Sequence, residues 1–258
     1  MAEPQKPDGG ERIAKRLARA GLCSRREAER WIAAGRVALD GETLTSPAVV
    51  VGAGARITVD GKPLPKAEAT RLWRYHKPRG LICTRRDPQG RPTVFDSLPP
   101  DLPRVVSVGR LDIDSEGLLL LTNDGALARR LELPATGWLR CYRVRAYGEA
   151  APEALAALAG GVAVAGVTYG PIAARLDRRQ GRNAWYTLSL GEGRNREVRR
   201  VMEHLGLTVS RLIRVAYGPF RLGTLAPGAV VEVPASELED RADAATAAPK
   251  PDHAYRRR

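Results

Sequence analysis

The stretch GRLDIDSEGLLLLTNDG, residues 109–125, places four carboxylates around four consecutive leucines. The leucine run, Leu118–Leu121, is too short for an independent helix, and glycine-containing turn segments bound it on both sides. A short, bounded apolar run of this kind is typical of a strand that is buried on both faces. The stretch therefore predicts a fully buried strand with an acidic loop directly before it.

The four carboxylates of this stretch have different expected roles. Asp124 directly precedes a predicted helix, where an aspartate caps the free backbone N–H groups. Asp114 and Glu116 flank Ser115 in an expected exposed loop, as solvated or paired surface acids. Asp112 has apolar neighbours on both sides, so it is either a catalytic or a paired structural carboxylate. A partly buried aspartate needs a cation to stay ionised, and arginine is the expected partner.

Candidate arginines are concentrated in GEGRNREVRRVMEHLG, residues 191–206. Helical spacing gives a packing face of Val198, Val201, Met202 and Leu205 and leaves Arg196, Arg199, Arg200 and Glu203 off that face. The two glycines before the helix allow close approach of a ligand to the helix N-terminus, which favours phosphate. An ordinary amphipathic helix with a basic outer face accounts for the stretch equally well.

Composition bounds the function class. The chain has 258 residues, a formal net charge of +13 and 43% hydrophobic residues, enough for one large domain or two smaller ones. The excess of basic residues favours a polyanionic partner, although a basic surface also suits an anionic membrane or simple solubility. The three cysteines and three histidines are scattered, which argues against a disulfide framework and a metal centre. With no signal-peptide pattern and no long apolar run, we expect a cytoplasmic protein.

The N-terminal region contains two expected helices. Residues 1–10 are polar and rich in Pro and Gly, which predicts a disordered leader. A first helix follows and stops at Gly21, and a second begins at Ser24, with Glu27 completing a capping box and Gly35 ending it. Two short strand pairs with Asp-Gly turns follow, giving a compact unit over residues 11–60.

Charge is unevenly distributed in this unit. Between Glu11 and Arg36 lie eight basic residues against three acidic ones. So local an excess favours a phosphate-binding surface, with two solvated helix faces as the alternative. We assign the phosphate contacts of this surface to Arg12, Lys15, Arg16, Arg19, Ser24, Arg25, Arg26 and Arg36.

A second domain is expected over residues 72–238, after a linker at 61–71. Strand-like and helix-like segments alternate in irregular order, which favours an α+β fold with a mixed, mostly antiparallel sheet flanked by helices. Residues 239–258 are rich in Ala, Asp and Pro and end in YRRR, which predicts a disordered basic tail with a nonspecific RNA contact.

Five segments, in the same order, resemble RNA pseudouridine synthases of the small-subunit (RsuA-like) and large-subunit type-B (RluB-like) branch. RIAKRLARAGLCSRREAERWIAAGRVALDGE resembles an S4 RNA-binding domain, and the others resemble parts of the catalytic domain. These others are YHKPRGLICTRRDPQGRPTVFDSLP, GRLDIDSEGLLLLTNDGALARRL, RCYRV, and EGRNREVRRVMEHLG with RLIRVAYGPFRLGTLAPG. The YHKP and GRPTVFD segments are more similar to the large-subunit type-B enzymes.

The resemblance implies site residues by position. It places the essential aspartate on Asp112, the tyrosine that packs against the target base on Tyr142, and the basic partner of the aspartate on Arg199. Val198 takes the aliphatic position that contacts the base, and Arg110 helps hold the loop or the flipped nucleotide. We add Arg196 as a further substrate contact.

The implied reaction converts a uridine of ribosomal RNA, preferably the 23S RNA of the large subunit, to pseudouridine. The N1–C1′ bond breaks and the uracil is rejoined through C5, so the product is an isomer that needs no cofactor, metal or second substrate. We expect the enzyme to be a monomer. Asp112 acts as nucleophile or as base near C1′ or C2′, which the sequence does not decide.

Three alternatives remain open from the sequence. In the first, the substrate is 16S rather than 23S RNA. In the second, the protein is a noncatalytic RNA-binding or ribosome-assembly factor that uses the S4 unit. In the third, Asp112, Asp114 and Glu116 hold a divalent metal in a hydrolase, whose activity a chelator abolishes.

Overall fold

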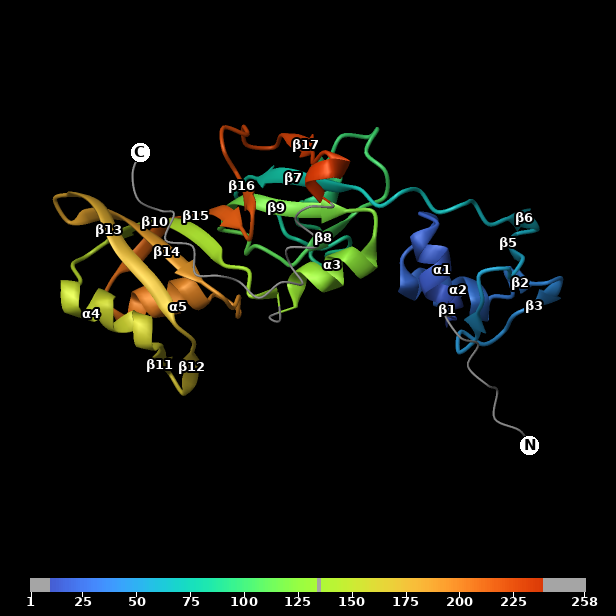
Figure 1. Ribbon diagram of the computed structural model, residues 1–258, viewed down its shortest axis with the longest axis horizontal. Helices are drawn as coiled ribbons and strands as arrows, with labels where there is room; N and C mark the ends of the chain where they lie inside the picture. The colour runs from blue at the N-terminus through green and yellow to red at the C-terminus, as the bar shows by residue number, and fades with distance from the viewer. Residues whose placement is uncertain (1–9, 134–135, 239–258) are drawn as a thin grey trace. The chain divides into compact units, whose positions relative to one another are not determined.

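The computed structural model describes residues 10–133 and 136–238 (Figure 1). Contacts divide the chain into two compact units, with the boundary between Thr70 and Arg71. The N-terminal unit also takes in two short segments, Leu102–Val105 and Asn123–Gly125. Residues 1–9 of the predicted leader and all of the predicted tail lie outside the described residues.

The N-terminal unit packs two helices on short strands. The Ser24 hydroxyl accepts a hydrogen bond from the Glu27 backbone N–H at 3.1 Å, and the Glu27 carboxylate accepts one from the Ser24 backbone N–H at 3.5 Å, so the predicted capping box is confirmed. The last strand pair extends to Pro63, into the predicted linker. The elements are β1 (Glu11–Arg12), α1 (Ile13–Arg19), α2 (Arg25–Ala33), β2 (Val37–Leu39), β3 (Glu42–Thr43), β4 (Val50–Val51), β5 (Ile57–Val59) and β6 (Lys62–Pro63).

The larger unit is built on a nine-stranded sheet with the order β13-β14-β10-β15-β9-β7-β17, to which β8 and β16 add at β9 and β15. Within the described residues, β9 and β15 pair in parallel and the other strand pairs of this sheet are antiparallel, so the predicted mixed, mostly antiparallel α+β fold is confirmed. Its strands are β7 (Leu72–Lys77), β8 (Val106–Val108), β9 (Glu116–Thr122), β10 (Arg140–Tyr147), β13 (Ile172–Gln180), β14 (Asn183–Leu190), β15 (Thr208–Tyr217), β16 (Phe220–Arg221) and β17 (Val230–Glu232), with a separate hairpin of β11 (Val162–Val164) and β12 (Val167–Tyr169).

The leucine run forms the middle of β9, and every residue of this strand is buried. Leu118 and Leu120 pack in a core cluster with α3 (Gly125–Glu132), while Leu119 pairs with Tyr75 of β7. The predicted strand buried on both faces is therefore confirmed. Its burial fixes the position of the acidic loop that leads into it.

Gly117 joins the two halves of the sheet. The parallel contact between β9 and β15 consists of two residue pairs, Glu116 with Ile213 and Gly117 with Arg214. Gly117 has φ +104, and a Cβ atom there would lie 2.3 Å from the Arg214 carbonyl oxygen. Because this distance is impossible for a side-chain carbon, the strands can meet only at a glycine.

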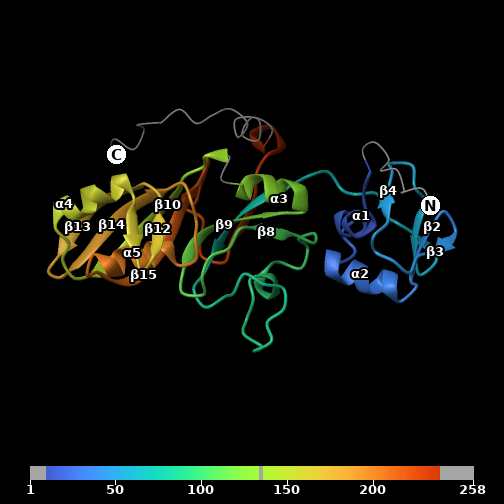
Figure 2. The same cartoon turned by 90° about the horizontal axis from the view of Figure 1, so that it is seen from below.

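Helices cover one face at the β13 end of the sheet. There α4 (Pro152–Ala157) packs against β13, and α5 (Glu197–His204) packs against β15 (Figures 1 and 2). The larger unit also contains the 3-10 turns η1 (Phe95–Ser97) and η3 (Leu158–Gly160). The longest helix of the described ranges, α2, has nine residues, so none of them could cross a bilayer.

Candidate active site

A pocket of about 890 Å³ opens in the larger unit where the acidic loop, β10, β15 and the start of α5 meet. It brings together five of the six residues that the sequence places at the catalytic site: Arg110, Asp112, Tyr142, Arg196 and Val198. Tyr142 and Val198 are buried, whereas Arg110 and Arg196 are exposed. The sixth, Arg199, is buried behind the lining of the pocket.

Lys77 binds the backbone of the acidic loop through hydrogen bonds. This lysine, the last residue of β7, is fully buried, and its Nζ donates to the backbone carbonyls of Ser115 at 2.8 Å, Pro78 at 3.0 Å and Asp112 at 3.2 Å. Burial lowers its pKa from the ordinary value. A hydrogen bond from the Ser115 N–H to the Asp112 carbonyl closes the turn. The backbone that carries the Asp112 carboxylate is therefore held at both ends of the turn.

Lys77 is a residue that the sequence interpretation missed. The available signal was a charged residue within an apolar strand, directly before a proline in YHKP. A buried ammonium has to satisfy three donors, which backbone carbonyls of a tight loop can do.

Arg199 holds the same loop from the side. Its guanidinium donates to the Asp114 carbonyl at 3.1 Å and to the Val209 carbonyl at 3.3 Å. Burial lowers its pKa, and Arg196 lowers it further, whereas Asp114 and Asp112 raise it. Arg199 thus lies within electrostatic range of Asp112.

Two expectations for Arg199 differ from the structure. The helix spacing placed it off the packing face, but it is only 7% exposed, because the acidic loop covers that side of α5. The expected ion pair with Asp112 is absent from the ion pairs of the described residues, since the guanidinium nitrogens Nη1 and Nη2 face backbone carbonyls instead.

The wall beside Tyr142 is basic. Tyr142 lies opposite Arg214 in the β10–β15 pairing, so both side chains face the pocket side of the sheet. Arg214 is buried, donates to the Leu118 carbonyl at 2.8 Å and lies 5.1 Å from the centre of the Tyr217 ring. Arg140 is also buried and donates to the Tyr217 hydroxyl at 3.1 Å. Sequence interpretation missed both arginines, because strand pairing brings them here from distant segments.

The start of α5 forms the opposite wall. Arg196 precedes the helix in a left-handed conformation, with φ 53, and leaves its side chain exposed at the pocket rim. Glu197 is 3% exposed and accepts a hydrogen bond from the Arg194 N–H at 2.8 Å. Burial raises the pKa of Glu197. This end of the helix offers a mixture of cations and one buried carboxyl to a substrate.

The remaining acids of the opening motif are distributed differently from expectation. Asp114 is exposed, as predicted, but Glu116 is only 6% exposed and begins β9. Its carboxylate accepts two hydrogen bonds from Arg211, at 2.6 and 3.1 Å, which lower its pKa. The expectation of an exposed loop at Glu116 was wrong, because the strand starts two residues before the leucine run. Asp124 accepts a hydrogen bond from Thr70 at 3.0 Å.

The basic residues of the N-terminal unit fall into two classes. Lys15 and Arg16 both pair with Glu11, and Arg36 pairs with Asp60 while stacking 4.7 Å from the centre of the Trp31 ring. The Ser24 hydroxyl is occupied in the capping box. The other residues assigned to RNA are exposed and form no ion pair within the described residues: Arg12, Arg19, Arg25 and Arg26.

Among residues 10–133 and 136–238, the structure shows no group of three or more His, Cys, Asp or Glu side chains placed to hold a metal ion. Asp112, Asp114 and Glu116 do not converge, since Glu116 is bound to Arg211. This arrangement does not favour the metal-hydrolase alternative.

Comparison with known proteins shows which family this chain resembles. The profile of the RNA pseudouridylate synthase family matches residues 71–204, and that of the S4 domain matches residues 11–57. A solved structure described as a pseudouridylate synthase superposes with a TM-score of 0.62 at 28% identity, covering 88% of this chain and 98% of its own.

Curated relatives agree. An uncharacterised RNA pseudouridine synthase of Rickettsia felis is 46% identical over 229 residues, covering 89% of this chain and 99% of its own length. The ribosomal large subunit pseudouridine synthase B of Salmonella typhi is 46% identical over 221 residues, covering 82% of this chain and 75% of its own. The chain therefore belongs to the RNA pseudouridylate synthase family, as an isomerase with an N-terminal S4 domain.

Proposed function

We propose that this enzyme converts a specific uridine of 23S ribosomal RNA to pseudouridine, with Asp112 as the catalytic residue. The observation that carries the proposal is the pocket of about 890 Å³ whose lining includes Asp112 and Tyr142 together with several arginines. The volume suits a nucleotide, and the charge suits its phosphates.

Asp112 supplies the chemistry in this proposal. The N1–C1′ bond breaks, C5 bonds to C1′ in its place, and the C5 hydrogen is lost while N1 gains one, so the atoms balance without a cofactor. The carboxylate must be ionised to act as nucleophile or base. Lys77 and Arg199 both place positive charge next to the turn that carries Asp112.

The surrounding residues bind and position the nucleotide. The target uridine is flipped into the pocket, at a cost of a few kcal/mol that binding contacts offset. Tyr142 stacks on the uracil, and Val198 contacts its other side from the start of α5. Arg110 and Arg196 are exposed at the rim, where they bind the neighbouring phosphates.

The choice of large-subunit RNA is supported by the relatives that carry that name. Besides the Salmonella typhi protein, a ribosomal large subunit pseudouridine synthase B of Haemophilus influenzae is 45% identical over 219 residues. With ribosomal RNA as substrate, the enzyme works in the cytoplasm, and we propose that it does so as a monomer.

Mapping pseudouridine at nucleotide resolution, in cells with and without the gene, tests the substrate. We expect one site in 23S RNA to disappear. A lost site in 16S RNA would replace the large-subunit assignment, and an unchanged map would favour a noncatalytic assembly factor.

Complementation with Asp112→Asn tests the catalyst. This substitution keeps the size of the side chain but removes the negative charge, so we expect the modification to be lost with RNA binding retained. Modification by the Asp112→Asn protein would overturn the catalytic assignment. Activity that a chelator abolishes would instead revive the metal-hydrolase alternative.

A further inference from the structure

The sheet has a second basic surface, on the face that points away from the pocket. Successive residues of a strand face opposite sides, so Arg143 and Arg145 of β10 face away from the side that carries Tyr142. Strand pairing places Arg145 in one transverse row with Trp185 of β14, and Trp185 in turn lies opposite Arg178 of β13. We call the surface formed by Arg143, Arg145, Arg178 and Trp185 the outer face.

A small hollow lies within the outer face. It has a volume of about 120 Å³ and is lined by Arg145, Arg178, Gln180, Asn183 and Trp185. The guanidinium of Arg143 stacks 4.9 Å from the centre of the Trp185 ring at its side. Two guanidinium groups and two amides around a phosphate-sized hollow, next to a tryptophan, are donors suited to a phosphate with a sugar or base beside it.

Within the described residues, Arg145 and Arg178 of the hollow form no ion pair with a carboxylate. Elsewhere on β13, Arg175 pairs with Asp177 at 2.8 Å and Arg179 pairs with Glu149 at 2.6 Å. Within the described residues, Arg143, Arg145 and Arg178 are exposed and form no ion pair. Positive charge is therefore concentrated at the hollow while the neighbouring arginines are neutralised.

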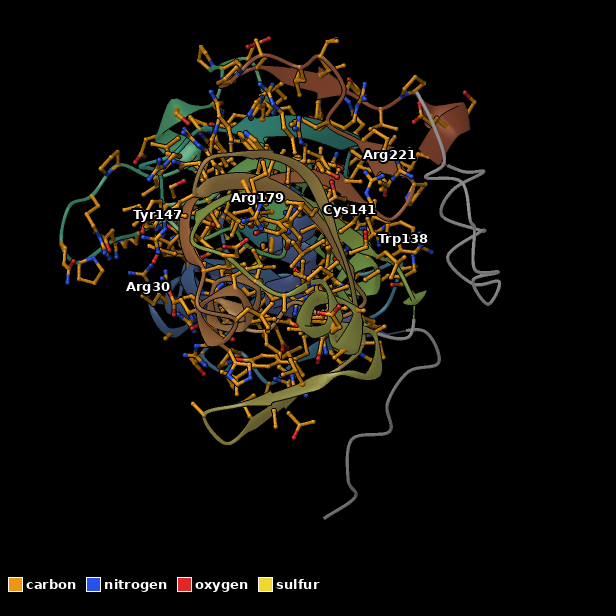
Figure 3. The ribbon with its side chains drawn as sticks, turned by 90° about the vertical axis from the view of Figure 1, so that its left-hand side faces the viewer. Arg30, Trp138, Cys141, Tyr147, Arg179 and Arg221 are labelled. Atoms are coloured by element: carbon orange, nitrogen blue, oxygen red, sulfur yellow. The ribbon has the colours of Figure 1, made fainter. Side chains whose placement is uncertain are left out.

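We propose that the outer face is a second RNA-binding surface, which holds a phosphate of the substrate RNA between Arg145 and Arg178. RNA is the polyanionic substrate of this enzyme family, and a ribosomal RNA is large enough to contact both faces of one sheet. Tyr147, labelled in Figure 3, lies two residues beyond Arg145 on β10 and therefore faces the same side of the sheet. The Arg182 guanidinium lies 4.8 Å from the centre of its ring, which adds a second aromatic group with a basic neighbour to this face.

Titration of a labelled poly(U) oligomer against the full chain tests the proposal. The double substitution Arg145→Gln and Arg178→Gln removes two phosphate contacts, so we expect about tenfold weaker binding in moderate salt. The slope of log affinity against log salt should become shallower by about 1.4, at about 0.7 per contact for a single strand. Ultraviolet crosslinking should attach the oligomer to the peptide containing Trp185, and less so in the double variant.

Arg179→Gln provides the matched control. It removes the same charge from the next residue of β13, but strand pairing places Arg179 opposite buried Ala184, on the other face from Trp185. We expect Arg178→Gln alone to weaken binding several-fold and Arg179→Gln to leave it unchanged.

Two results would overturn the proposal: unchanged affinity and salt slope in the double variant, or equal losses in Arg178→Gln and Arg179→Gln, which would indicate a general charge effect. The binding measurement needs no turnover, so its outcome is independent of which uridine the enzyme modifies. Turnover at saturating RNA should match the wild type, since neither arginine lines the pocket.

Discussion

The acidic loop and the S4 domain use basic residues in opposite ways. Around the loop, Lys77 and Arg199 are buried and donate to backbone carbonyls of residues 112–115. On the S4 domain, Arg25 and Arg26 are exposed on α2 and form no ion pair within the described residues. Lys77 and Arg199 therefore stabilise the folded loop, whereas Arg25 and Arg26 are exposed and can contact RNA.

The comparison shows that burial, more than residue type, decides what a cation does. A buried cation must satisfy its donors inside the protein, so it fixes the backbone around it. An exposed cation gains little from a surface partner and is free to release counterions on binding a phosphate. Substitutions in the two regions should therefore change different measured quantities.

Lys77→Met should have the largest effect. It removes three hydrogen bonds to backbone carbonyls, at about 1 kcal/mol each, which lowers the unfolding free energy by about 3 kcal/mol. We expect the melting temperature to fall by about 6–12 °C. Turnover, measured as tritium release from rRNA labelled at uridine C5, should fall by about 100-fold as the Asp112 loop moves.

Lys62→Met is the control for this substitution, because Lys62 is exposed on β6. It should change neither quantity. A Lys77→Met protein with wild-type melting and turnover would contradict this role of the Lys77 hydrogen bonds.

Substitutions of Arg199 distinguish the effect of its charge from the effect of its two hydrogen bonds. Arg199→Gln removes both, and we expect kcat to fall by about 100-fold with KM little changed. Arg199→Lys keeps the charge but cannot reach the Asp114 and Val209 carbonyls together, so we expect a loss of about tenfold. The neighbouring Arg200→Gln, on the exposed side of α5, should have no effect. Equal activity in the glutamine and lysine variants would mean that the charge has no role.

Local patterns in the sequence predicted much of the fold. The leucine strand and the Ser24 capping box follow from residues within a few positions of each other, and both were confirmed. The order of the sheet is different, because it depends on pairings between segments far apart, such as Gly117 with Arg214. No short-range periodicity contains that information.

The dependence on pairings between distant segments also limits what the sequence predicts about the candidate active site. Asp112, Tyr142 and Val198 were placed by resemblance, and the structure brings them into one pocket. Arg140 and Arg214 were missed, since their role depends on the register of β10 against β15. The buried position of Arg199 was missed because helical spacing does not tell which loop covers a helix.

The S4 domain should show a smaller effect that is confined to binding. Arg25→Gln with Arg26→Gln removes two exposed charges, so we expect KM for RNA to rise about tenfold and kcat to stay unchanged. Arg36→Gln is the matched control: Arg36 already pairs with Asp60, and its loss should raise KM less. A lower kcat in the double variant would show that these arginines do more than bind RNA.

The smallest effect concerns pH. The hydrogen bonds from Arg211 lower the pKa of Glu116 below the unfolded value of 4.5, so the folded state favours the ionised form. The stabilisation is fully present above pH 4.5 and is lost as the pH falls through the lowered folded pKa. Glu116→Gln should melt about 2–4 °C below the wild type at neutral pH. That difference should shrink as the pH falls below 4.5, and a constant difference would contradict the ion pair.

The contact at Gly117 makes the spacing of the proposed catalytic groups depend on one backbone position. Asp112 leads into β9 on one side of this contact, while Tyr142 and Arg214 belong to the strands on the other side. A side chain at 117 would push the two groups of strands apart and widen the distance between carboxylate and tyrosine. We therefore expect pocket width to vary among related enzymes through the loops at the pocket rim, while the contact between positions 117 and 214 stays the same. A redesign of the pocket for a bulkier nucleobase would also begin with the rim loops.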